Sequence, residues 1–145
     1  MAKSFAEQIG AWASRTEKRI DAVYARSIEL LAEEMSKTTK EGGKVPIDTG
    51  NLANSLLASK QSMPTTSDGP FTGSNVGIIT ATIRASHSVW LGYQAGYARR
   101  INNGFVGADS RGRVYNQQGA HFVESAVANW SNIVETAVNE IRFGR

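Results

Sequence analysis

The sequence contains no cysteine, which excludes disulfides and thiolate metal ligands. It also has no apolar run near the roughly 18 residues that a membrane-spanning helix needs, so we expect no membrane partner. Residues 1–7 lack the apolar core of a signal peptide, which favours synthesis in the cytoplasm. Neither sign of charge is in large excess, because 16 Lys and Arg residues against 13 Asp and Glu residues leave a net charge of +3. A balance this mild does not by itself indicate a nucleic-acid partner.

Motifs of catalysis and cofactor binding are also missing. The sequence has no Gly-x-Ser-x-Gly nucleophile elbow and no phosphate-binding Gly-x-x-x-x-Gly-Lys-Ser/Thr loop. Its two histidines are His87 and His121, and only His121 has a carboxylate at helical spacing, that of Glu124. A metal site needs more ligands than this pair supplies, so a structural role is favoured. We expect no catalytic residue, no metal and no cofactor.

A long N-terminal helix is the clearest element that is present. The 145 residues fit one domain, and apolar residues recur every three or four positions over residues 4–40. Ser4 and Glu7 have the spacing of a capping box at its start, and Gly42 suits its C-terminal cap. We therefore divide the single domain into a helical part, residues 1–44, and an α+β body, residues 45–145.

The length of this helix poses a choice. About 36 residues make a helix of roughly 54 Å, whereas a compact domain of this size has a radius of gyration of roughly 15 Å. Either the helix breaks near Gly10 or Ser14, or its end, with Phe5, Ile9 and Trp12, packs against a partner. The second alternative predicts an oligomer.

We predict that the body consists of short helices and strands followed by a second long helix. We predict strands over 56–62, 75–85 and 87–92, a helix over 96–103, and strands 105–108 and 113–116 paired around a turn. Residues 75–85 have the clearest alternation of β-branched side chains, and residues 119–142 carry the apolar stripe of a second long helix. The order indicates an α+β fold, with the long N-terminal and C-terminal helices packed on a small antiparallel sheet.

Two exposed segments are candidates for contact with partners. Residues 63–74 are rich in Pro, Gly, Ser and Thr and form a long loop that contains Phe71. The turn at 109–112 carries Arg111, and Arg113 follows it. We expect Arg111 and Arg113 to contact an adjacent subunit or another assembly protein.

The aromatic residues before this turn allow two interpretations. Trp90, Tyr93, Tyr97 and Phe105 could form a stacking surface for nucleic acid together with Arg99 and Arg100. We favour a core position for Trp90, Tyr97 and Phe105, with solvated arginines, because strand and helix spacing already accounts for these aromatics. The alternative is a small basic DNA-binding module that uses Arg99, Arg100, Arg111 and Arg113, with an affinity that falls steeply with salt.

A corner at residues 45–56 joins the long helix to the strands. Its marked positions are Pro46, Asp48, Thr49, Gly50, Leu52 and Ser55. Asp48 or Thr49 can cap the start of a short helix, and Gly50 permits an unusual backbone path. Asp-Thr-Gly is also the triplet of aspartic proteases, but those enzymes need two apposed aspartates and this chain has one triplet. We interpret the corner as structural.

This corner, small-Pro-hydrophobic-Asp-Thr-Gly-x-Leu-x-x-Ser, resembles the start of the phage tail-component domain known as HK-ninety-seven gene-product-ten-like. Two further blocks of that family follow in the same order, one from Tyr97 and Ala98 to Gly104, the other from Phe122 to Ala126. The chain departs from the family at residues 102–103, where the family often has Glu, and at residues 120–121, where it often has Pro. These departures concern the subtype rather than the fold.

The resemblance implies a non-enzymatic structural protein of a tailed-phage virion. Such neck or tail-completion proteins join the DNA-filled head to the tail. Implied partners are other copies of the chain in a ring or collar, the stopper or connector, and the tail terminator or tail tube, with packaged DNA passing nearby. The implied location is the virion neck, after synthesis in the host cytoplasm. The candidate contact residues are Phe5, Ile9, Trp12, Phe71, Arg111 and Arg113.

Overall fold

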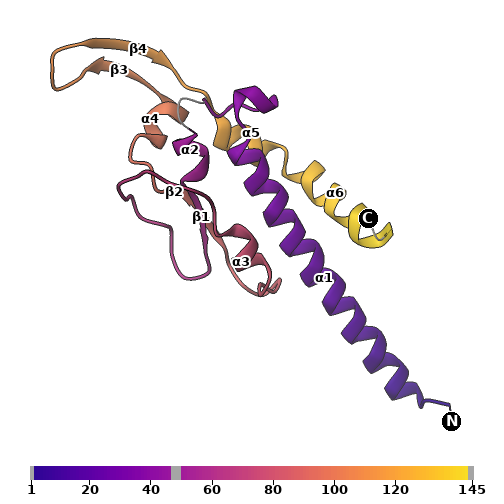
Figure 1. Cartoon of the computed structure of the whole chain (residues 1–145). Coiled ribbons are helices and arrows are strands. Elements are labelled where there is room, and N and C mark those ends of the chain that lie inside the picture. The colour runs from indigo at the N-terminus through magenta and orange to yellow at the C-terminus, as the bar shows by residue number, and fades with distance from the viewer. Residues whose placement is uncertain (1, 47–49, 144–145) are drawn as a thin grey trace.

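The protein has an α+β fold in the computed structural model, which describes residues 2–46 and 50–143. Two long helices accompany a set of short helices and two small antiparallel sheets (Figure 1). The elements are α1 Phe5–Ser36, the 3-10 turn η1 Thr39–Glu41, α2 Asn51–Asn54, β1 Leu56–Ser59, α3 Val76–Thr80, β2 Trp90–Tyr93, α4 Ala98–Asn103, β3 Gly104–Ala108, β4 Val114–Gln118, α5 Phe122–Ala128 and α6 Trp130–Phe143.

Helix α1 is continuous over 32 residues, which corresponds to about 48 Å. Its predicted capping box is present, because the Ser4 Oγ accepts from the Glu7 N–H at 3.1 Å and the Ser4 N–H donates to Glu7 Oε2 at 2.9 Å. The helix ends at Ser36, earlier than predicted. Gly42, at φ 86°, caps the following turn η1 rather than α1 itself.

The strands form two separate pairs instead of the one small sheet that we expected. β1 pairs antiparallel with β2, from Leu56 opposite Tyr93 to Ser59 opposite Trp90. β3 pairs antiparallel with β4 around the predicted turn, and Gly112 has the positive φ, 76°, that this turn requires. The predicted strands at 56–62 and 87–92 therefore exist, but both are shorter or displaced by a few residues.

The predicted strand over 75–85 is wrong, because this segment contains helix α3. The residues of this segment fit the three-to-four-residue spacing of a helix as well as the alternation of a strand. The residues that are buried are spaced as on one face of a helix. Val76, Thr80 and Ile83 are buried, whereas Ile78 is 76% exposed. The Thr80 hydroxyl donates to Glu29 Oε1 on α1 at 2.8 Å. Packing against α1 thus overrides the β propensity of the segment.

The predicted C-terminal helix is divided at Asn129. Here α5 ends and α6 begins one residue later, with the Asn129 N–H bonded to the Ala126 carbonyl at 3.1 Å. The first of these helices is fixed by Asn102 of α4, whose Oδ1 accepts from the Val123 N–H at 3.0 Å. The change of direction lets α5 cover the body while α6 lies along α1 (Figure 1).

Two adjoining clusters of buried side chains form the core. One lies where α1, β1, α3 and α5 meet, and its buried members are Ala32, Met35, Leu56, Ala58, Val76 and Ala126. The other holds the corner against α4 and α5, and its buried members are Val45, Leu52, Ala95, Ala98 and Phe122. Tyr93 links them, because its ring meets Phe122 edge-on at 5.3 Å and its hydroxyl donates to the Met35 carbonyl at 2.7 Å.

The molecule is elongated by two projections at opposite ends. The N-terminal part of α1 extends past the body at one end, and the β3–β4 hairpin projects from the other (Figure 1). Neither projection lies over the two core clusters. Both are therefore available to partners.

Candidate functional site

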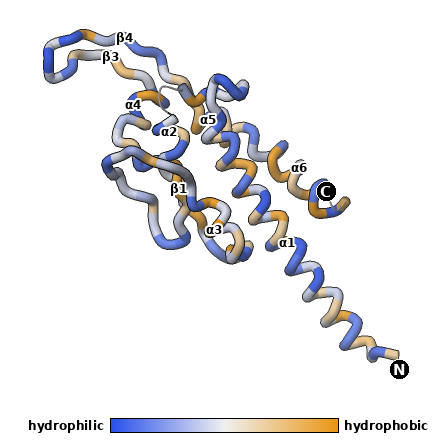
Figure 2. Tube along the Cα trace, viewed as in Figure 1, coloured by the Kyte–Doolittle hydropathy of each residue, from blue (hydrophilic) through white to orange (hydrophobic). Residues whose placement is uncertain are grey.

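The N-terminal part of α1, residues 5–20, which we call the overhang, exposes large apolar side chains. Phe5 is 79% exposed, Trp12 60% and Ile20 53%. Because α1 has no break at Gly10 or Ser14, the bent alternative is excluded. Figure 2 shows hydrophobic positions recurring along α1 out to its N-terminal end. A helix with an apolar stripe and no core beneath it presents a contact surface.

The apolar stripe of the overhang leads directly into a groove between α1 and α6. The groove has a volume of about 440 Å³. It is lined by Thr16, Arg19, Ile20, Val23, Tyr24, Ser27, Ala85, Trp130, Val134 and Val138. Positions 5, 9, 12, 16, 20, 23 and 27 follow the three-and-four spacing of one helix face, so overhang and groove form one continuous apolar surface. We call it the α1 surface.

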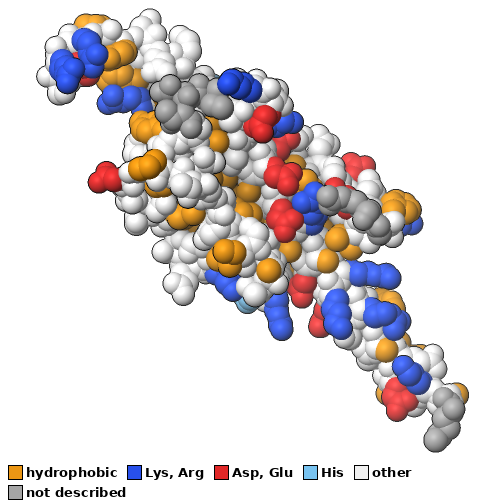
Figure 3. All heavy atoms as spheres, viewed as in Figure 1, with side chains coloured by type: hydrophobic (Ala, Val, Ile, Leu, Met, Phe, Trp, Pro, Cys, Tyr) orange, Lys and Arg blue, Asp and Glu red, His pale blue; other side chains and the backbone are white. Residues whose placement is uncertain are grey.

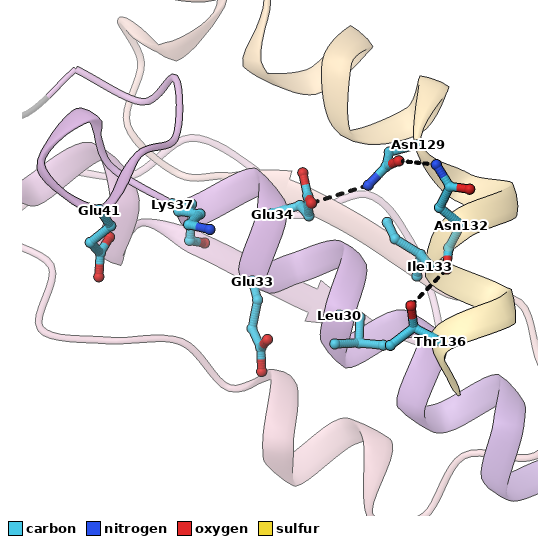
Figure 4. A pocket seen from close by; sticks show the side chains of 10 residues that line it. Leu30, Glu33, Glu34, Lys37, Glu41, Asn129, Asn132, Ile133 and Thr136 are labelled. Carbon is cyan, nitrogen blue, oxygen red and sulfur yellow. Dashed lines mark hydrogen bonds between the residues drawn. The ribbon is translucent and has the colours of Figure 1, made fainter. Parts of the chain in front are cut away.

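A second hollow between α1 and α6, with a volume of about 570 Å³, is lined mainly by residues with polar side chains, together with Leu30 and Ile133 (Figure 4). Its acidic residues already have partners. Glu34 accepts from Asn129 at 3.1 Å, Glu33 lies 3.6 Å from Arg26, and Glu41 accepts from Thr38. Among the described residues no three His, Cys, Asp or Glu side chains lie together as metal ligands would. The carboxylates of this hollow are thus engaged in hydrogen bonds and an ion pair within the chain.

The β3–β4 hairpin has two chemically different faces. One carries Phe105 and Tyr115, whose rings lie 6.2 Å apart, and the Arg100 guanidinium stacks over Phe105 at 3.9 Å from its centroid. The other carries Val106 and Val114, which are 77% and 82% exposed. Strand alternation separates the two sets. The hairpin thus presents an arginine–aromatic face and an aliphatic face.

Asp109 organises the tip of the hairpin. Its Oδ1 accepts from the backbone N–H groups of Arg111 and Arg113, both at 2.9 Å, and its Oδ2 accepts from the Arg113 Nε at 2.6 Å. Although partial desolvation opposes the shift, these bonds and one from Tyr115 lower the pKa of Asp109. Arg113 is therefore neutralised locally, whereas the Arg111 side chain has no carboxylate partner among the described residues.

A shallow hollow of about 310 Å³ lies at the base of the hairpin, between α4 and β3. Arg99 and Arg100 line it together with Phe105 and Asn103. Two arginines thus meet at the base of the arginine–aromatic face and two at its tip. Figure 3 shows basic side chains gathered at this end of the molecule.

The predicted motif residues divide into buried and exposed groups. Leu52, Ser55, Ala98, Phe122 and Ala126 are buried. Gly50 is the N-cap residue of α2, at φ 81°, and Gly104 begins β3 at φ 86°. Pro46 is exposed, and Asp48 and Thr49 lie outside the described residues.

The prediction that Trp90, Tyr97 and Phe105 lie in the core needs correction at all three residues. Tyr97 is 46% exposed rather than in the core, and its hydroxyl accepts from Asn51 Nδ2 at 3.1 Å. Trp90 and Phe105 are half-buried and belong to neither core cluster. Phe71 is half-buried too and packs against the cluster around Leu52, so the structure turns this candidate contact inward.

Asn102 is a positioning residue that the sequence marked only as a departure from the family pattern. It is 6% exposed, and its Nδ2 donates to Glu124 Oε1 at 2.7 Å while its Oδ1 receives the Val123 N–H. The bond from Asn102, assisted by His121 at 3.3 Å, lowers the pKa of Glu124. The pair of His121 and Glu124 thus belongs to the joint between α4 and α5.

Comparisons with known proteins do not assign the chain to a family. No protein-family model, no curated protein and no solved structure matches the chain. Over residues 2–46 and 50–143, none of the helices combines the length and the apolar character needed to cross a bilayer.

Proposed function

We propose that the protein is a non-enzymatic structural component of a tailed-phage virion, a neck or tail-completion protein that joins head and tail as a homo-oligomer. The observation that carries the proposal is the α1 surface. A 32-residue helix extends beyond its own body with Phe5, Ile9 and Trp12 exposed. The family resemblance of residues 45–56, 97–104 and 122–126 supplies the phage context.

We infer that the overhang of one copy packs into the groove of the next copy. Seven residue steps separate Phe5 from Trp12, which is about 10 Å of helix. The α1 side of the groove runs from Thr16 to Ser27, about 16 Å, so the three large side chains fit its length. This contact is head-to-tail, and such contacts close into rings when the rotation between copies permits.

The energetics favour a closed assembly over a single pair. Full burial of three large apolar side chains contributes about 5–9 kcal/mol at 1.5–3 kcal/mol each. Loss of translational and rotational freedom on association costs about 4–15 kcal/mol. One overhang contact is thus marginal. A single pair leaves one overhang and one groove unoccupied. In a closed ring every overhang occupies a groove, so each copy gains one full contact.

The oligomeric state of the purified full chain tests this proposal. Native mass measurement and negative-stain electron microscopy should give discrete rings for the wild type. Trp12→Ser in the overhang and Val138→Asp in the groove should each shift the population to monomers. Val114→Ser is the matched control, because Val114 is as exposed as Phe5 but lies on the hairpin. Its rings should persist.

Two results would contradict the proposal. One is a wild-type chain that stays monomeric at every concentration, alone and with neck or tail proteins. The other is a set of overhang and groove variants that assemble as the wild type does. The virion role has its own test: a phage that carries Trp12→Ser should produce filled heads and separate tails, whereas normal joined particles would argue against it.

A further inference from the structure

One end of the molecule carries a net charge as large as that of the whole chain. Residues 94–120 hold four arginines and a single acidic residue, Asp109, which leaves +3. The remaining 12 basic and 12 acidic residues cancel, so this segment accounts for the entire net charge. It comprises α4 and the β3–β4 hairpin, the end that lies farthest from the overhang (Figure 1).

All the basic residues in this segment are arginines, and three have no carboxylate partner among the described residues. These are Arg99, Arg100 and Arg111; Arg113 is paired with Asp109. The guanidinium group offers planar, forked donors that match phosphate oxygens. Stacking on Phe105 holds the Arg100 guanidinium in place and leaves the donors at its edge available.

We propose that the arginine–aromatic face of the hairpin, with the hollow at its base, binds the phosphate backbone of duplex DNA. Arg99 and Arg100 contact phosphates at the base, and Arg111 contacts them at the tip. Five strand steps from Gly104 to Asp109 span about 17 Å. One DNA strand carries a charge every 3.4 Å or so of helix axis, so the two ends of the hairpin reach phosphates about five nucleotides apart.

The geometry favours duplex DNA over single-stranded nucleic acid. Proteins that bind single strands expose aromatic rings on which bases stack. Here the Phe105 ring is covered by Arg100 and also contacts Tyr115. The contacts left available are therefore with phosphates.

The two faces of the hairpin allow DNA and protein contacts to coexist. The aliphatic face, with Val106 and Val114, is exposed on the opposite side of the hairpin, where it is open to a protein other than a second copy of the chain, while the arginine–aromatic face stays available to DNA. Charge contacts of this kind do not depend on base sequence. The inference goes beyond the structural role proposed above, and it stands or falls on the purified protein alone.

Fluorescence anisotropy with a labelled duplex and the full chain tests the inference. Three phosphate contacts predict a plot of log affinity against log salt with a slope of about −3. Affinity should then fall about 60-fold between about 50 and 200 mM salt. The double variant Arg100→Gln with Arg111→Gln should reduce the slope to about −1. Arg100→Lys with Arg111→Lys keeps both charges and should retain most of the slope.

Two controls distinguish binding by this surface from a general effect of positive charge and from damage to the hairpin. Arg15→Gln with Lys18→Gln removes two basic residues of the overhang that do not line the groove, and it should leave the slope unchanged. Val106→Ser with Val114→Ser alters the opposite face of the same hairpin and should also leave it unchanged. Thermal unfolding followed by circular dichroism verifies that each variant is folded.

Three results would overturn the inference. One is no duplex binding at about 50 mM salt. The second is equal loss of affinity in the overhang control, which would indicate non-specific charge. The third is a glutamine variant that binds DNA like the wild type but no longer forms oligomers, which would assign the arginines to a contact with another copy.

Discussion

Arg26 of α1 and Glu140 of α6 form an ion pair across the two long helices, with the Arg26 Nε 2.6 Å from Glu140 Oε2. Both side chains are largely buried, at 17% and 19% exposure. The hydrogen bond that Arg26 donates to Glu140 raises the pKa of Arg26 above its ordinary value, although burial opposes the shift. The pair borders the region where α6 forms one wall of the apolar groove, so it fixes the relative position of the two helices there.

Breaking this ion pair should destabilise the protein. Arg26→Ala leaves the Glu140 carboxylate in a partly buried position, and we expect a loss of about 1–3 kcal/mol in the free energy of unfolding, measured by urea denaturation. Glu33→Gln is the matched control, because Glu33 lies 3.6 Å from the same guanidinium but is 66% exposed. It should cost less than about 0.5 kcal/mol. Equal effects of the two substitutions would refute the assigned role.

Gly104 and Gly112 should respond differently to alanine. Both have positive φ, but a Cβ at Gly104 would lie 2.7 Å from the Gln117 carbonyl oxygen and 2.8 Å from the Gly119 nitrogen, whereas one at Gly112 meets no atom within 4 Å. Gly112→Ala should cost about 1–2 kcal/mol from backbone conformation alone. Gly104→Ala should cost a further 1–3 kcal/mol or so, because the base of the hairpin must shift. Thermal unfolding measures both, and a smaller loss at Gly104 would contradict the packing described.

The helical conformation of α3 can be tested at two residues that a strand would place on one face. Val76 is 8% exposed and Ile78 is 76% exposed. Val76→Ala should therefore cost about 2 kcal/mol, and Ile78→Ala less than about 0.5 kcal/mol. Denaturation midpoints give the comparison. A large loss of stability in Ile78→Ala would instead support the strand that the alternation predicted.

Acid should weaken the joint between α4 and α5. Glu124 has a lowered pKa because Asn102 donates to its carboxylate. A group whose pKa is lower in the folded state stabilises the fold above its unfolded pKa, here 4.5, and loses that effect as the pH falls through the lower folded value.

The difference in stability between wild type and Glu124→Gln should thus be constant near neutral pH and shrink below about pH 4.5. Urea midpoints across this range measure it. Glu135→Gln on α6 is the control, because its carboxylate has no bonded partner among the described residues, and it should show no such change. A Glu124→Gln difference that persists undiminished in acid would rule out the carboxylate as the source.

The two long helices and the hairpin were predictable because their signals are local. The capping box of Ser4 and Glu7, the helical spacing of α1 and the Gly112 turn each depend on neighbours a few residues away. The strand predicted at 75–85 failed because its β-branched residues fit both periodicities. Only the position of α1 selected the helical face that contains Val76 and Thr80.

The candidate surfaces were predicted in part. Helix length made the overhang with Phe5, Ile9 and Trp12 one of two alternatives, and the hairpin arginines were evident in the sequence. Neither the groove beside Trp130 nor the stacking of Arg100 on Phe105 could be predicted, because each joins elements whose relative positions are set by tertiary packing. Asn102 was missed for the same reason, since its partners lie about 20 residues away on α5.

The sequence by itself determined that α1 is too long for its domain and that the basic charge of the chain collects near residues 99–113, because length and charge are properties of the chain. Only the tertiary structure decided where these features lie. The groove between α1 and α6 begins at Thr16, beyond Trp12, and the hairpin projects from the opposite end. Burial of the intervening core leaves one apolar surface and one arginine surface at separate ends of the same molecule.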